Sequence, residues 1–322
     1  MTTCRNKTLD GLKFLLIVLV TIGHFSEPYR YTHSIIGAGY SAIYLFHMPL
    51  FILLSGYFSK HITFGKIKKS FYATWEAYLV MALACIVLSS HSWYSLIIPS
   101  SSYWYLIALI VWKIVYYLLG KILHKNSVIL LLSIAMVPIS MLLINKHNEV
   151  LSIMRVICFF PFFIIGTMLS ESSIQKIKSH RIFLAVLAII IFILIITLSS
   201  RYIHELEWHR KGVYRLSEEF GYPASYIFLS IILIYGASVV TIMSMLAISK
   251  LPHWICQYGK YSLTFYVLQD VSWNLSKNFP NLPMVVQYFW CVLTILMGVI
   301  LVNRNWQYFV NRPFSHFCKL IW

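Results

Sequence analysis

Charged residues are scarce in this chain. Only 11% of its 322 residues are Asp, Glu, Lys or Arg, and just ten of these are acidic, whereas 59% are hydrophobic and the mean hydropathy is +0.75. A soluble domain exposes far more charge than this, so the composition excludes a soluble globular protein. It predicts an integral membrane protein whose apolar segments cross the bilayer several times.

Cysteine is also sparse and forms no pattern. The six cysteines are scattered, with no CxxC pair and no Cys/His spacing of the kind that a zinc site needs. We therefore expect neither a disulfide framework nor a bound metal ion.

Ten apolar stretches are present. The first runs from Asp10 to Phe25 and lacks a small-residue cleavage site after it, so we interpret it as a helix and not as a signal peptide. The others are residues 38–58, 71–90, 102–120, 127–144, 151–170, 182–200, 224–248, 261–275 and 284–302. Most can cross ~30 Å of hydrocarbon as helices. The expected fold is all-α, a polytopic integral membrane protein of about ten transmembrane helices, with a single domain over residues 1–322.

Basic residues predict the orientation of the chain. With both termini cytoplasmic, 18 of the 26 Lys and Arg residues, Lys113 among them, fall on the inner side and 7 on the outer side, while Arg155 lies inside a helix. The net charge of +16 then reflects inner loops that face anionic membrane lipids, and nucleic-acid binding is the poorer interpretation. The long charged outer loop, residues 201–222, is either a solvated connector or a lid over an acceptor.

The first helix carries three ionisable side chains. Lys13 and His24 are eleven residues apart, which places them within about 20° of one helix face and roughly 16 Å apart along the axis; Asp10 lies within about 40° of that face. A histidine at membrane depth is a functional candidate unless it merely packs. An isolated Lys13 would snorkel to the headgroups, and we expect Asp10 to cap the helix in preference to orienting Lys13. The shared face predicts a polar path from the helix mouth to mid-bilayer.

The second helix contains the motif FHMPLFILLSGYF at residues 46–58. Pro49 removes a backbone donor and should kink the helix at or before His47, while Ser55 and Gly56 allow another helix to approach closely. Ordinary kinked packing explains these residues without any chemistry. The lysines that follow are Lys60, Lys66, Lys68 and Lys69. They could bind anionic lipid or, equally, a phosphorylated cofactor.

Together, Lys13-x10-His24 and the 46–58 motif resemble the acyltransferase-3 family of integral membrane O-acyltransferases, most closely its stand-alone, fucose 4-O-acetylase-like branch. The resemblance extends to Trp104-Tyr105-Leu106, to Arg155 with FFPFFIIG at 159–166, and to the stretch Gly259–Tyr266. It implies transfer of an acyl group, usually acetyl from cytoplasmic acetyl-CoA, to a hydroxyl of a glycan or lipid-linked sugar. It also implies a ten-helix fold in a bacterial cell membrane.

Two positions depart from the family pattern. Gln269 stands where histidine is common, and a glutamine can form hydrogen bonds but cannot shuttle a proton. Ala77-Tyr78 stands where a Pro-Tyr pair is common, and the sequence gives no physical account of the adjacent Glu76.

The candidate residues fall into three expected roles. The catalytic base is His24, because a neutral imidazole can take the proton of an attacking sugar hydroxyl. The groups expected to bind acyl-CoA are Lys13, Lys66, Lys68, Lys69 and Arg155. The groups expected to line the substrate cavity are Asp10, His47, Ser55, Trp104, Tyr266 and Gln269. A transporter or flippase for a glycan intermediate or small solute is the alternative, since buried ionisable residues also fit a relay; a scaffold role is weaker.

Overall fold

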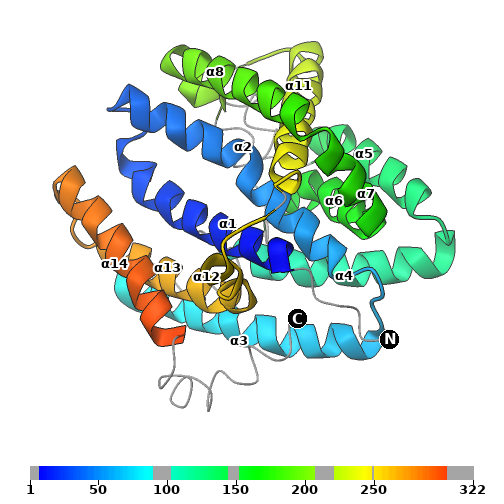
Figure 1. Cartoon of the computed structure of the whole chain (residues 1–322), viewed down its shortest axis with the longest axis horizontal. Coiled ribbons are helices and arrows are strands. Elements are labelled where there is room, and N and C mark those ends of the chain that lie inside the picture. Colours follow the sequence, from blue (N-terminus) through cyan, green and yellow to red (C-terminus); the bar gives the residue numbers. More distant parts are fainter. Residues whose placement is uncertain (1–6, 90–102, 144–151, 207–220, 249, 303–322) are drawn as a thin grey trace. The chain divides into compact units, whose positions relative to one another are not determined.

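A computed structural model describes residues 7–89, 103–143, 152–206, 221–248 and 250–302. Its long helices are α1 (Lys7–Ser26), α2 (Ser34–Tyr57), α3 (Phe64–Ser89), α4 (Trp104–Leu123), α5 (Asn126–Leu143), α6 (Ile153–Met168), α8 (Arg181–Leu206), α11 (Ala224–Leu246), α13 (Ser262–Ser276) and α14 (Met284–Val302) (Figure 1). The short ones are α7 (Glu171–Ser179), α12 (His253–Cys256) and the 3-10 turns η1 (Glu27–Tyr29) and η4 (Gly259–Tyr261). Each expected apolar stretch contains a long helix, which confirms the all-α fold.

Seven of the described helices are long and apolar enough to cross a membrane: α1 with η1, α2, α3, α4, α8, α11 and α14. Helices suit the bilayer because every backbone N–H and C=O is satisfied within the segment. α6 continues into α7 through a bend of 99°. α7 is short and polar, and Ser170 caps it by accepting a hydrogen bond from the Ser173 amide at 3.0 Å. The seven long apolar helices confirm a polytopic membrane protein.

The chain forms two compact units, which we describe separately. The α1 unit comprises Met1–Phe25, Thr63–Ile110 and Ser249–Trp322. The α2 unit comprises Ser26–Ile62 and Val111–Ile248. The division runs through α4, so that its first turns belong to the α1 unit and the remainder to the α2 unit.

Within the α2 unit, two glycines bring helices α2 and α6 into backbone contact. A Cβ atom on Gly56 would lie 2.0 Å from the Phe163 carbonyl oxygen, and one on Gly166 would lie 1.9 Å from the Leu53 oxygen. This confirms the close approach expected from Ser55-Gly56. Pro49 has no N–H for the Leu45 carbonyl one turn earlier, and Ser238 of α11 donates its hydroxyl to that oxygen at 2.7 Å.

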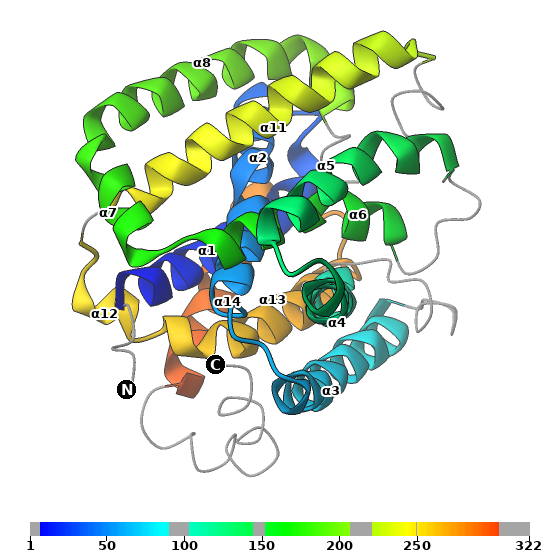
Figure 2. The same ribbon diagram turned by 90° about the vertical axis from the view of Figure 1, so that its right-hand side faces the viewer.

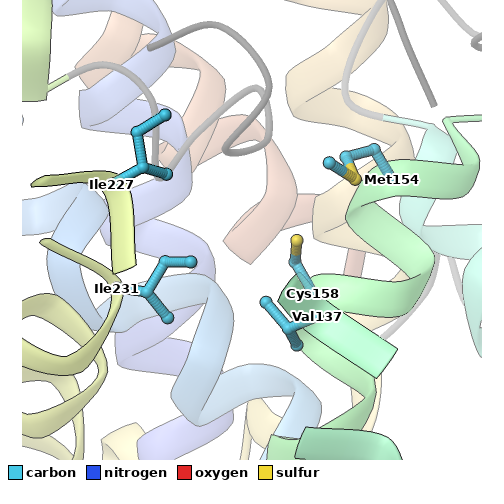
Figure 3. Packing of buried hydrophobic residues seen from close by; sticks show 5 residues of the cluster. All are labelled: Val137, Met154, Cys158, Ile227 and Ile231. Carbon is cyan, nitrogen blue, oxygen red and sulfur yellow. The ribbon is translucent and has the colours of Figure 1, made fainter. Parts of the chain in front are cut away.

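Apolar packing completes the α2 unit. Figure 3 shows Ile227 and Ile231 of α11 facing Val137 of α5 and Met154 and Cys158 of α6, all of them buried. α8 runs beside α11 (Figure 2) and also packs on α2. Tyr235 of α11 donates its hydroxyl to the Cys158 carbonyl oxygen.

Within the α1 unit, aromatic rings join α1 to α13. Phe14 lies 5.1 Å from Phe265 between ring centroids, and Phe25 lies 5.5 Å from Trp273. Gly259 sits directly on α1, because a Cβ there would lie 1.9 Å from the Asp10 carbonyl oxygen. α13 packs in turn on α3 and α14. These contacts fix α13 alongside the helix that carries the candidate base.

Several sequence-based boundaries are wrong. The stretch expected at 71–90 begins at Phe64, so Lys66, Lys68 and Lys69 occupy the first turns of α3 and do not form a separate loop. Lys113 is not in an inner loop but is buried within α4. α8 extends to Leu206 and takes up the start of the predicted outer loop. The rest of that loop, 207–220, and both chain ends lie outside the described residues.

Candidate functional site

A buried ion pair occupies the beginning of α1. Lys13 Nζ lies 2.9 Å from Asp10 Oδ1, and the two side chains are 1% and 7% exposed. The snorkelling interpretation of Lys13 is therefore wrong. The capping interpretation of Asp10 is also wrong, since α1 begins three residues earlier at Lys7 and the carboxylate pairs with Lys13. A buried cation is costly to hold without such a partner, so Asp10 fixes Lys13 in the interior.

A pocket of ≈ 180 Å³ opens beside this ion pair. It is lined by Lys7, Asp10, His253, Cys256, Gln257 and Lys260, and we name it the α1-mouth pocket. Burial raises the pKa of the Cys256 thiol, and the nearby Asp10 charge raises it further, while Lys7 opposes both. The thiol therefore stays protonated near neutral pH, which makes it a poor nucleophile.

His24 lies at the other end of α1, in its last turn, and is half-buried. α1 ends two residues later at Ser26, and the apolar span that contains it continues through η1 to Tyr29. The mid-bilayer depth of His24 stays a prediction. The His24 ring centroid lies 6.2 Å from that of Trp273 on α13. Asp10 and His24 are fourteen residues apart, or about 21 Å along the helix axis. α1 thus carries a buried ion pair near its first residues and an imidazole in its last turn.

The face of α13 beside His24 is polar and buried. Gln269 is 1% exposed, and Asp270 and Asn274 are fully buried. Asn274 donates from Nδ2 to the Asp270 carboxylate at 3.1 Å, and Lys277 Nζ donates to Asn274 Oδ1 at 3.0 Å. Asp270 and Trp273 are three residues apart and share a helix face, so the carboxylate belongs to the face that meets His24.

Sequence reasoning missed Asp270 and Asn274 as functional candidates. The available signal was an acid inside an apolar stretch, which is a functional hypothesis by default. Both residues lie inside the predicted apolar stretch 261–275, where the sequence assigned them no role. Asp270 is buried and lies one helical turn from Trp273, whose ring is near that of His24. It is therefore a stronger candidate for a functional residue than several residues chosen by motif.

The remaining candidates of the α1 unit separate into two sets. Trp104 and Tyr266 are buried, and Tyr105 lies between them. The Tyr105 ring centroid is 6.4 Å from that of Trp104 and 5.8 Å from that of Tyr266. This aromatic row connects α4 to α13 near the polar face. The lysines of α3, which are Lys66, Lys68 and Lys69, are exposed. They are not among the residues that line the α1-mouth pocket.

Three candidates belong to the α2 unit, and two of them have local partners. His47 Nδ1 lies 2.8 Å from the Ile43 carbonyl oxygen, and Ser55 donates to the Phe51 carbonyl at 2.9 Å, both within α2. Arg155 is half-buried at the third residue of α6, near the helix start and not mid-helix. Both side chains are buried, and each of these hydrogen bonds stays within α2.

At the end of α2, Tyr57 donates its hydroxyl to Glu171 of α7 at 2.6 Å, and Lys60 lies 3.9 Å from the Tyr57 ring centroid. Burial lowers the pKa of Lys60, and Glu171 partly opposes this shift. The Tyr57–Glu171 hydrogen bond therefore joins α7 to the end of α2. Among the described residues, no group of three or more His, Cys, Asp or Glu side chains could hold a metal ion.

Comparison with known proteins fits this arrangement. The family described as "Acyltransferase domain" (Acyl_transf_3) matches residues 6–308. A stretch of 56 residues is 45% identical to the protein named "Nodulation protein NolL" from Sinorhizobium fredii (strain NBRC 101917 / NGR234). That stretch covers 16% of this chain and 15% of that protein, so the similarity spans only a small part of either. No solved structure matches the chain. Because the family match covers nearly the whole sequence, the chain belongs to the acyltransferase-3 family of membrane acyltransferases.

Proposed function

We propose that this protein transfers an acetyl group from acetyl-CoA to a sugar hydroxyl of a cell-surface or extracellular polysaccharide, in a bacterial inner membrane. The observation that carries the proposal is the layout of α1, with the buried Asp10–Lys13 pair at one end and His24 beside the polar face of α13 at the other. Family membership supplies the acyl-transfer chemistry. The donor, the acceptor and the role of His24 are our inference.

In the proposed reaction, the sugar hydroxyl oxygen attacks the thioester carbonyl while His24 takes the hydroxyl proton. The C–S bond breaks, CoA leaves as a thiolate, and the imidazolium returns the proton to that sulfur. The product is the sugar ester and free CoA. A sugar hydroxyl is a weak nucleophile at neutral pH, which is why a positioned base is needed.

The donor enters from the mouth of α1 in this proposal. A phosphorylated nucleotide cannot enter hydrocarbon, so its head stays at the cytoplasmic end, near the Asp10–Lys13 pair, while the pantetheine arm extends along α1. The arm must bring the thioester to His24 over about 21 Å measured from Asp10. Transfer then takes place near the outer end of α1.

In this proposal the acceptor binds beside His24, at the end of α1 opposite the donor entrance. Gln269, Asp270 and Asn274 offer a buried amide, carboxylate and second amide, which suit a polyhydroxylated ligand, and Trp273 offers a ring. We assign Trp104 and Tyr266 to the wall of this region. In the expected orientation α6 runs inward, so Arg155 at its start faces the outer side. This argues against Arg155 as a ligand of a donor phosphate on the cytoplasmic side.

Radiolabelled acetyl-CoA tests the proposal. Purified protein in lipid nanodiscs is mixed with labelled donor and a glycan extract, and glycan-bound label is counted. We expect label in the glycan only when protein is present. A transporter or flippase would leave the glycan unlabelled. Mass spectrometry of surface polysaccharide from deletion and complemented cells then identifies the sugar and the hydroxyl.

A further inference from the structure

The α1-mouth pocket carries more positive than negative charge. Lys7 and Lys260 line it, together with His253 and the amide of Gln257. Its one carboxylate, Asp10, is already engaged by Lys13 at 2.9 Å. Lys260 Nζ also lies 4.7 Å from the centroid of the neighbouring Tyr261 ring. The pocket therefore presents two cationic groups without an equal anionic counterpart.

The backbone around the pocket favours an anion as well. The pocket lies at the first turn of the 20-residue helix α1, whose amide end carries a partial positive charge. Gly259 keeps the loop on that turn, since a Cβ there would lie 1.9 Å from the Asp10 oxygen. Gly11 likewise lies against Cys256 of α12. The site is thus built by close contacts between α1, α12 and η4.

We infer that the α1-mouth pocket binds phosphate groups of the acyl-CoA donor, with Lys7 and Lys260 as the charge partners. The inference rests on the proposed function, since it identifies part of the site where that donor would enter. Asp10 joins the pocket to buried Lys13, so a phosphate here lies at the start of the path that leads to His24. The exposed lysines of α3 are the rival position, and they do not line this pocket.

Cys256 provides a reporter that does not depend on catalysis. Its half-buried thiol lines the pocket, whereas Cys85, Cys158 and Cys291 are buried. N-ethylmaleimide labelling of Cys256 is followed by mass spectrometry of its peptide, at a pH high enough to populate the thiolate. The protein is held in phosphatidylcholine nanodiscs, with CoA or pantetheine as the added ligand. A parallel set of nanodiscs contains phosphatidylglycerol and is labelled without CoA and with CoA, because lipid headgroups carry the same phosphate chemistry.

The expected result is that CoA slows labelling of Cys256 and pantetheine does not, since pantetheine lacks the phosphates. Lys7→Glu/Lys260→Glu should weaken the Kd obtained from CoA protection by roughly tenfold or more. The control Lys176→Glu/Lys250→Glu makes the same charge change at exposed lysines outside the pocket and should stay within about twofold. Elution as a monodisperse peak establishes that each variant is folded.

Two outcomes overturn the inference. Equal protection by phosphatidylglycerol, with no further effect of CoA, would assign the pocket to a lipid headgroup. Labelling unaffected by CoA in phosphatidylcholine would place the donor phosphates elsewhere. Protection by CoA in a protein that transfers no label supports the phosphate site while the proposed transfer reaction fails, so the two claims are tested separately.

Discussion

Helices α1 and α2 each carry a histidine that the family motifs single out, yet their surroundings differ. His47 on α2 is buried, lies 2.8 Å from a carbonyl oxygen of its own helix, and belongs to a segment that packs backbone to backbone on α6. His24 on α1 is half-buried beside a face of α13 that holds a buried carboxylate and two amides. From these surroundings we propose that His47 serves packing and that His24 serves the chemistry.

The same contrast extends to charge. In the α1 unit, the Asp10–Lys13 pair and Asp270 are buried ionisable groups, which membrane proteins retain at a cost and mostly for function. In the α2 unit, Pro49 and Gly56 explain the proline motif through a carbonyl that Ser238 satisfies and through close helix contact. The α2 unit also holds a buried cation, Lys113, but the buried carboxylates Asp10 and Asp270 both lie in the α1 unit, and we propose that the reaction takes place there.

The largest stability effect should come from breaking the buried ion pair. Asp10→Asn leaves Lys13 as an uncompensated buried charge and should cost about 3–5 kcal/mol. The matched control is Glu27→Gln, because Glu27 and Arg30 have the same i,i+3 spacing but lie 3.6 Å apart and are partly exposed, so about 1 kcal/mol or less is expected. Thermal unfolding in detergent measures both. Equal losses in Tm would show that burial of the first pair has no special role.

A second effect tests the packing role of α2. Gly56→Ala forces the new Cβ against the Phe163 carbonyl and should destabilise the protein by about 1–3 kcal/mol or more. Gly236→Ala in α11 is the control, since a Cβ added there would meet no other atom within 4 Å, and it should be neutral or slightly stabilising. Transfer activity per folded molecule should survive in both variants. Loss of activity from folded Gly56→Ala protein would bring α2 into the chemistry.

The smallest effect should come from Gln269. Gln269→Ala removes a buried hydrogen-bonding group and should reduce transfer by about tenfold, equivalent to roughly 1 kcal/mol. Gln269→His should retain activity, because imidazole can also form hydrogen bonds. Initial rates at saturating donor provide the comparison. A decrease as large as that of His24 variants would give the amide a catalytic role.

Much of the fold follows from the sequence alone. Apolar stretches long enough to cross a bilayer must become helices, and this physical constraint identified all the long helices. Gly56 predicted the close contact between helices, because only a residue without a side chain permits that approach. The kink at Pro49 stays a prediction. Boundaries were less predictable, as with α3, which begins at Phe64, since polar first turns such as Lys66–Lys69 can extend a helix into the interface.

The candidate site was only partly predictable. The spacing of Asp10 and Lys13 placed them on one face, but whether Lys13 would snorkel or be buried depends on what surrounds it, which periodicity does not reveal. Asp270 and the α1-mouth pocket depend on contacts between segments about 250 residues apart in the chain. Such tertiary contacts cannot be derived from the local pattern around either segment.

The most direct test of the central claim compares two histidines in one assay. His24→Gln and His47→Gln are purified in nanodiscs, shown to be folded and to bind CoA, and assayed for label transfer from acetyl-CoA to glycan. Glutamine preserves hydrogen bonding but cannot accept the hydroxyl proton, so His24→Gln should lose transfer by ~10²–10⁴-fold. His47→Gln should lose activity only as far as its stability falls. Near-normal transfer by folded His24→Gln would contradict the account and remove His24 as the base.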